Sequence, residues 1–311
     1  MRVVCTGSNG FIGRHTVRRL IEAGHRILGI DRNLPAYTGD PFGAYKPMAW
    51  DITDYAGVET AFKRFRPDAV LHLAANASLQ QSIETPFYDA HHNIFGTLSV
   101  LQAAQRSGCK RIVLASTSAV YGPKEDGLYL ETDLVAPQSP YGVSKAAGEM
   151  YCACSGLSWA ALRYGNVYGP GQKPLGENIL IARALAHMLD GIPFQINGDG
   201  EQVRDWVYVK DVAEANLRAL ESEDQGTFNI ATGRGISVNQ IIDELGTVTG
   251  HADPIPFGPA KPGELRRVVM YIGRARMKLG WEPQTALAEG LAETVRAWKL
   301  ERAEQEQPET A

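Results

Sequence analysis

The chain has 311 residues, of which 44% are hydrophobic and 21% charged, as is typical of a soluble globular protein. Its formal net charge of −4 argues against a basic surface for nucleic acid or for an anionic membrane. No segment approaches the about 20 apolar residues that a membrane-spanning helix needs, and 4 cysteines are too few for a disulfide framework. We therefore expect a cytoplasmic protein with reduced thiols.

Short apolar segments alternate with amphipathic segments in the first half of the chain. The apolar segments predict strands at residues 2–6, 26–30, 69–74 and 111–115. Helical patterns lie at residues 12–23, 55–65 and 86–107. Strands that alternate with helices of this length predict an α/β fold with a doubly wound parallel sheet.

The composition of the sequence changes after about residue 165, where glycine and proline become frequent. We expect a smaller C-terminal α/β lobe from this point. Segments around residues 205–232, with a strand at 228–231, are expected to return to the large domain. The predicted division is a first domain at residues 1–165 and a C-terminal lobe at residues 166–311.

The first predicted strand runs into a glycine-rich turn, in which Gly7, Gly10 and Gly13 have the spacing G-x-x-G-x-x-G. Glycines let the backbone approach a pyrophosphate, and the helix that follows directs its free N–H groups at the negative charge. The second predicted strand ends at Asp31, where a carboxylate can bind ribose hydroxyls and repel a 2′-phosphate. The pattern predicts a dinucleotide site that favours NAD over NADP, although the neighbouring Arg32 weakens this preference.

Tyr141 and Lys145 lie four residues apart in a segment where Pro140 suits a helix start, so they share one helix face. A nearby ammonium lowers the pKa of a phenol from its usual value of about 10, which predicts a base near neutral pH. Three hydroxyl residues follow the strand at 111–115, at the strand end where open α/β sheets place their chemistry: Ser116, Thr117 and Ser118.

Several motifs together resemble the extended short-chain dehydrogenase/reductase family, in its NAD-dependent epimerase/dehydratase branch. They are TGSNGFIG at 6–13, DI at 51–52, LAA at 73–75, STSAVYG at 116–122, SPYGVSK at 139–145, RYGNVYGP at 163–170 and GDGEQVRD at 198–205. The likeness runs from residue 1 to about residue 295. It implies a Rossmann-type NAD-binding domain followed by a substrate-binding lobe.

The resemblance also implies roles for individual residues. Tyr141 would be the base, Lys145 would hold the nicotinamide ribose, and Thr117 would polarise the sugar hydroxyl, with Ser116 and Ser118 as alternatives. Besides the glycines, Asp31 and these two residues, the implied NAD contacts are Phe11, Ile12, Asp51, Ile52, Leu73, Ala74, Ala75 and Asn93. The implied nucleotide-sugar contacts, besides Thr117, are Asn166, Asn178, Phe194, Gln195, Arg204, Lys261 and Glu264. Many relatives have Arg and Asp at the last two positions, so a looser contact is expected there.

Two positions distinguish the reactions within the family. Dehydratase relatives carry Thr-Asp-Glu where this chain has Thr117, Ser118 and Ala119, and decarboxylase relatives have a glutamate at the last of these. What remains matches the 4-epimerases, which implies an isomerase that interconverts UDP-glucose and UDP-galactose through a 4-keto intermediate with retained NAD. Val268 stands where some relatives have a bulky aromatic residue, which predicts tolerance of the N-acetyl forms.

Alternatives remain open at this point. They are another NAD-dependent nucleotide-sugar oxidoreductase, a UDP-glucuronate 4-epimerase, and a non-catalytic NAD-binding sensor. The resemblance implies a homodimer, although segment 146–162 is about one helical turn shorter than in typical relatives. No metal site is expected, because Cys152, Cys154, His91 and His92 lack partners at ligand spacing.

Overall fold

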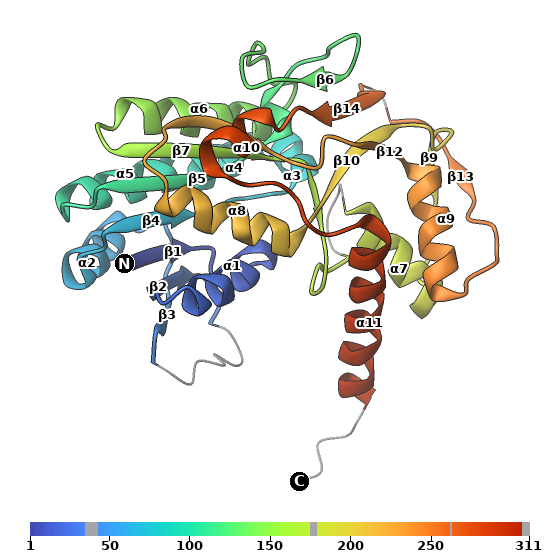
Figure 1. Cartoon of the computed structure of the whole chain (residues 1–311), viewed down its shortest axis with the longest axis horizontal. Coiled ribbons are helices and arrows are strands. Elements are labelled where there is room, and N and C mark those ends of the chain that lie inside the picture. Colours follow the sequence, from blue (N-terminus) through green and yellow to red (C-terminus); the bar gives the residue numbers. More distant parts are fainter. Residues whose placement is uncertain (35–42, 175–178, 262, 307–311) are drawn as a thin grey trace.

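Seven parallel strands form the large sheet, in the order β11-β7-β5-β4-β1-β2-β3 (Figure 1). Their bounds are β1 Arg2–Thr6, β2 Arg26–Asp31, β3 Tyr45–Ala49, β4 Ala69–His72, β5 Arg111–Thr117, β7 Ser158–Tyr164 and β11 Gly226–Ile230. The computed structural model describes residues 1–34, 43–174, 179–261 and 263–306. Strand order reverses between β1 and β4, and doubly wound folds bind their ligands at such a switch point.

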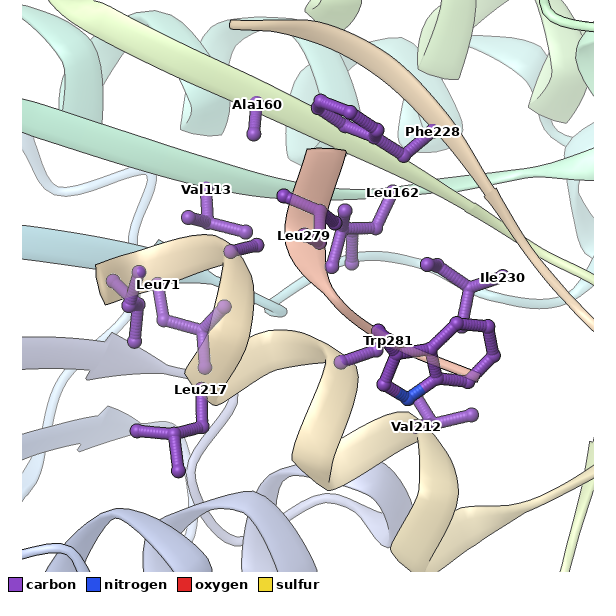
Figure 2. Close-up of a cluster of buried hydrophobic side chains, with 14 of the residues drawn as sticks. Leu71, Val113, Ala160, Leu162, Val212, Leu217, Phe228, Ile230, Leu279 and Trp281 are labelled. Carbon is purple, nitrogen blue, oxygen red and sulfur yellow. The ribbon is translucent and has the colours of Figure 1, made fainter. Parts of the chain in front are cut away.

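Helices cover both faces of this sheet, so the strands are buried on both sides (Figure 1). One face is covered by α1 (Phe11–Glu22), α8 (Val209–Glu221) and α10 (Gly273–Leu279). The other face is covered by α2 (Tyr55–Phe65), α5 (Gly96–Arg106) and α6 (Pro140–Cys154). Figure 2 shows the first of these cores, where Trp281 lies beside Val212 and Ile230. The predicted α/β fold with a doubly wound parallel sheet is thereby confirmed.

The helix expected at residues 86–107 is present, but it is not uniform. It consists of α4 (Pro86–Ala90), a π-helical turn at His91–Phe95, and α5, preceded by the short α3 (Leu79–Glu84). A π turn widens the helix locally and recurs at functional sites. The sequence pattern missed β3 and β7; β3 holds Pro47, which an edge strand tolerates because its free side needs no N–H donor.

A second, smaller layer lies beyond the carboxyl ends of the large sheet (Figure 1). Its five strands are β6 (Leu128–Tyr129), β8 (Asn166–Tyr168), β10 (Val203–Tyr208), β12 (Gly235–Ser237) and β14 (Arg267–Met270), and a two-stranded ribbon joins β9 (Ile196–Asn197) to β13 (Phe257–Gly258). Its helices are α7 (Leu180–Asp190), α9 (Val238–Thr249) and α11 (Leu287–Glu306). Both layers contain distant parts of the chain, since β6 belongs to the small sheet and β11 to the large one.

Each lobe has its own apolar core. In the small lobe, Tyr168, Trp206 and Leu245 belong to one buried cluster. Among the residues that the structure describes, no helix combines the length and the apolar character that crossing a membrane requires. The division of the chain at residue 165 stays a prediction.

Candidate functional site

The glycine-rich turn after β1 is packed so closely that two of its glycines leave no room for a side chain. Gly7 has a left-handed backbone with φ of +69°, and a Cβ on it would lie 2.7 Å from the backbone nitrogen of Ala74. A Cβ on Gly13 would lie 2.0 Å from the carbonyl oxygen of Gly7. Helix α1 begins at Phe11, directly after Gly10, so its unpaired N–H groups follow the turn. These features suit the binding of a pyrophosphate.

A cavity of about 320 Å³ opens at this turn, at the switch point of the large sheet. It gathers fourteen of the residues predicted to bind cofactor or to act in catalysis: Gly7, Gly10, Phe11, Ile12, Gly13, Asp31, Asp51, Ile52, Leu73, Ala74, Ala75, Ser116, Tyr141 and Lys145. Sequence reasoning assigned no lining role to Ile30, Trp50, Ala77, His92, Ala115 and Tyr164, although Ile30 and Trp50 immediately precede predicted contacts. The glycine turn and the carboxylate together fit a dinucleotide.

Asp31 is held in place at the end of β2 by two backbone groups. Its carboxylate accepts hydrogen bonds from the N–H groups of Asn9, at 3.0 Å, and Asn33, at 3.1 Å. Arg32 lines the same cavity, and its guanidinium donates to the hydroxyl of Tyr88 at 3.1 Å. A carboxylate fixed at this point would favour a ribose diol over a 2′-phosphate, and this role of Asp31 stays a prediction.

Tyr141 and Lys145 lie in the first turns of α6. The helix begins with Ser139, whose side chain accepts from the N–H of Gly142 at 3.1 Å, followed by Pro140. Gly142 lets this helix approach the turn after β5, because a Cβ there would lie 2.3 Å from the carbonyl oxygen of Ala119. Helix α6 thereby packs closely against the turn that follows Ser116 and Thr117.

The electrostatics of this pair differ from the expectation based on spacing. Burial raises the pKa of Tyr141 to about 12, opposed by a hydrogen bond with Thr117. Burial lowers the pKa of Lys145 to about 8, and its ammonium donates to the carbonyl oxygen of Ala115 at 2.8 Å. The predicted lowering of the Tyr141 pKa is therefore wrong for the protein without ligand, because desolvation raises this pKa by more than the contact with Thr117 lowers it.

The three hydroxyl residues have different surroundings. Thr117 shares a hydrogen bond with Tyr141, and Ser118 begins a short 3-10 turn. Ser116 donates to the carboxylate of Glu149 at 2.5 Å. Thr117 therefore acts on the Tyr141 hydroxyl, whereas Ser116 lines the cavity and is bonded to Glu149.

Asn93 does not belong to the lining of the cavity but to a buried chain of hydrogen bonds behind it. The Thr97 hydroxyl donates to the carbonyl oxygen of Asn93 at 2.6 Å, so it accepts from Nε2 of His72 at 3.0 Å. Nδ1 of His72 then accepts from the Thr6 hydroxyl at 2.7 Å. Burial lowers the pKa of His72 to about 3, which agrees with this neutral tautomer. The chain ties β1 and β4 to the π turn.

A second, smaller cavity of about 80 Å³ lies in the small lobe. It brings together six of the predicted substrate contacts: Asn166, Phe194, Gln195, Arg204, Lys261 and Glu264. Asn178, also predicted, lies outside the described residues. Trp206, for which the sequence left a lining role and a core position equally open, also lines this cavity. The sequence did not predict the other lining residues, which are Ile179, Leu180, Arg183, Asn197, Gln202 and Val238. Gln202 directly precedes β10, and Arg204 and Trp206 follow at every second residue, so all three side chains point to the same face of the strand. This period of two was the sequence signal that could have predicted them.

The second cavity combines charge with aromatic surface. Arg204 forms an ion pair with Glu264 at 2.7 Å, and its side chain is largely buried. The guanidinium carbon of Arg183 lies 5.5 Å from the ring centroid of Phe194. A guanidinium suits phosphate oxygens, and an aromatic ring suits a nucleotide base.

Gly13→Ala is expected to weaken NAD binding more than about tenfold, because the Cβ would displace the Gly7 carbonyl from beneath the pyrophosphate turn. Calorimetric titration of the purified variant with NAD measures this effect. Gly246→Ala, in the interior of α9, is the matched control, and its NAD affinity should equal that of the parent. Equal affinity of the Gly13 variant would contradict the role of the turn.

Comparison with known proteins agrees with this geometry. A model of the NAD dependent epimerase/dehydratase family matches residues 3–231. A UDP-glucose 4-epimerase from Mycolicibacterium smegmatis is 37% identical over 306 residues, which cover 95% of this chain and 97% of that relative. Among solved structures, the UDP-glucose 4-epimerase of Thermotoga maritima with UDP-glucose has a TM-score of 0.92 and 39% identity, with 97% of this chain and 100% of that chain covered.

The UDP-glucose 4-epimerase of Thermus thermophilus in complex with NAD has a TM-score of 0.88 at 38% identity, and 96% of this chain and 99% of that chain are covered. The family model alone spans more than half of the sequence, and its description names NAD as the cofactor. The resemblance predicted from the motifs is confirmed: the chain belongs to the NAD dependent epimerase/dehydratase family.

Proposed function

We propose that the protein is a nucleotide-sugar 4-epimerase, an isomerase that interconverts UDP-glucose and UDP-galactose with retained NAD. The observation that carries this proposal is that Tyr141 and the buried Lys145 line the dinucleotide cavity together, one helical turn apart on α6. This is the acid–base apparatus for oxidising a sugar hydroxyl and reducing the ketone again. Ser118 and Ala119 offer no carboxyl group at the positions that eliminate water or assist decarboxylation in other members.

The residues divide the reaction between them. Tyr141 takes the proton of the sugar 4-hydroxyl, and Thr117 orients that hydroxyl through its own hydrogen bond. Lys145, held by the Ala115 carbonyl, keeps its other N–H groups for the cofactor ribose. When bound, NAD would supply a positively charged ring that favours the phenolate, together with the hydride acceptor and donor that oxidation and reduction at C4 require. The same tyrosine gives the proton back.

The small lobe is the proposed site of the nucleotide. Arg204 and Lys261 are the cationic groups for the diphosphate, and Phe194 borders the base. Glu264, which pairs with Arg204, is placed to accept from ribose hydroxyls. In this proposal, residues 1–165 form the NAD-binding domain and residues 166–311 the substrate lobe, apart from the segments around 205–232.

The function is tested by incubating the purified protein with UDP-glucose without added cofactor and resolving the products by chromatography. UDP-galactose should form over many turnovers. Requirement for stoichiometric NAD would favour a net oxidoreductase instead. Turnover of UDP-glucuronate but not of UDP-glucose would identify the protein as a UDP-glucuronate 4-epimerase. Binding of nucleotide sugars without turnover would favour a sensor. UDP-N-acetylglucosamine is included because Val268 is smaller than the aromatic residue of some relatives.

We also propose a homodimer in the cytoplasm. The surface formed by α4, the π turn and α6 exposes large apolar side chains, among them Phe87 (93% exposed), Phe95 (61%) and Met150 (60%). A hollow of about 780 Å³, which Phe95, Leu98 and Tyr151 help to line, opens on the same surface. A second copy of the chain would cover this apolar area. Sedimentation velocity should give a dimer for the parent protein and a monomer for Phe95→Glu.

The four cysteines are free, and Cys154 is exposed. Free thiols agree with the reducing interior of a cell, which supports the cytoplasmic location.

A further inference from the structure

Asp89, on α4, is a buried carboxylate close to the catalytic helix. Only 1% of the surface of this residue is exposed. One of its oxygens accepts from the amide of Asn93 at 2.9 Å and lies 3.4 Å from the amide nitrogen of Asn76. Both of these partners are neutral polar groups.

The contacts of Asn93 determine which way its amide faces. Its Oδ1 accepts from the backbone N–H of Asn76 at 2.7 Å, so its Nδ2 must face the other side. From there Nδ2 reaches Asp89, and it lies 3.0 Å from the Asn76 carbonyl and 3.1 Å from the Ser144 hydroxyl. Asp89 is therefore a charged acceptor for an amide whose orientation the backbone of Asn76 also specifies.

The same network leads into the first turn of α6. Ser144 precedes Lys145 directly, and its hydroxyl is 2.9 Å from the carbonyl oxygen of Tyr141. The π turn after α4 places Asp89 and Asn93 on the side of the helix that packs against α6. Asp89, Asn93 and Ser144 thus connect the π turn to the backbone between the two reactive side chains.

The charges around Lys145 single out Asp89. Two carboxylates act on this buried ammonium, Asp89 and Glu149. Glu149 is held by both arms of Arg163, at 2.9 and 2.7 Å, so much of its charge is already compensated. Asp89 has neutral hydrogen-bond partners, and its charge also acts on Tyr141.

We propose that Asp89 is a positioning residue for the epimerase reaction: through Asn93 and Ser144 it fixes the turn that carries Tyr141 and Lys145, and its charge balances that of Lys145. The inference rests on the proposed function. The charged and titratable groups around the pair are Tyr141, Lys145, Glu149 and Cys152 on α6, Asp89 and His92 on α4 and the π turn, His72 on β4, and Arg163 and Tyr164 on β7.

Asp89→Asn tests the proposal, because it keeps the shape of the side chain and removes the charge. The Asp89 charge raises the pKa of both Tyr141 and Lys145. Without the Asp89 charge the tyrosine loses its proton at lower pH, so the acidic limb of the kcat/KM profile shifts to lower pH. The lysine also loses its proton at lower pH, so the alkaline limb moves in the same direction. We expect shifts of about half a pH unit or more, with kcat reduced about tenfold.

A second readout does not depend on turnover. In protein labelled with ε-¹³C lysine, the Lys145 resonance, assigned by its absence from Lys145→Met, should titrate near pH 8 in the parent. Its midpoint should be lower in Asp89→Asn. This experiment tests Asp89 even if the parent fails to convert UDP-glucose, which would overturn the proposed function alone.

Asp211→Asn is the matched control. Asp211 is also a buried carboxylate, and it accepts from the backbone N–H groups of Gln284 and Thr285, far from α6 in the chain. Its loss should leave both limbs and the Lys145 midpoint unchanged. If Asp89→Asn does not fold, Asp89→Ser removes the same charge and should give the same shifts. A lower kcat without a shift of the kcat/KM limbs or of the Lys145 titration midpoint would leave Asp89 only a structural role and overturn the proposal. Unchanged kinetics in Asp89→Asn would overturn it as well.

Discussion

Tyr141→Phe is expected to lower kcat for UDP-glucose epimerisation by about 10³-fold, equivalent to roughly 4 kcal/mol of transition-state stabilisation. Phenylalanine fills the same space but has no hydroxyl, so the sugar 4-hydroxyl loses its proton acceptor. Thr117 keeps its place, because its side chain also accepts from the N–H of Ala119 at 3.2 Å. Chromatographic progress curves at saturating substrate measure the loss.

Two controls separate chemistry from folding. NAD affinity, measured by calorimetry, should change little, because most of the cavity lining comes from other residues. Tyr129→Phe removes a different buried hydroxyl, which has no hydrogen-bond partner within the described part of the chain, and it should retain parental activity. Parental kcat in Tyr141→Phe would show that another group serves as the base.

Arg163→Met is expected to destabilise the protein by about 3–5 kcal/mol, since it leaves the Glu149 carboxylate buried without its cation. The side chains of this pair are only 3% and 7% exposed. Burial lowers the pKa of Arg163, but its contacts with Glu149 and Tyr121 together raise it by more, so the guanidinium stays charged in the folded protein. Equilibrium unfolding in denaturant measures the free energy of unfolding.

The paired variant Arg163→Met with Glu149→Leu supplies the control for this effect. Removing both charges should recover most of the lost stability, because the cost lies in the unpaired carboxylate rather than in the missing contact. The Ser116 hydroxyl then loses its acceptor, so recovery should stay incomplete. A double variant as unstable as the single one would instead indicate that the stacking of the Arg163 guanidinium over the Tyr121 ring, whose centroid lies 4.7 Å from the guanidinium carbon, dominates.

The difference between these two predictions lies in how each residue is recognised. Tyr141 and Lys145 follow from their spacing in the sequence, because a helix places residues four apart on one face. Glu149 and Arg163 come from α6 and β7, and Asp89 comes from α4. No local pattern marks them, since their partners are brought together only when the sheet and its helices pack.

The local sequence was sufficient for the elements and motifs that depend on neighbouring residues. Alternating apolar segments predicted β1, β2, β4 and β5, and the glycine spacing predicted the turn into α1. Tertiary structure decided the remainder. It made β3 a strand despite Pro47, by placing it at the edge of the sheet. It also reversed the expected direction of the Tyr141 pKa shift, because burial depends on every element around a side chain, whereas spacing describes only its nearest neighbours.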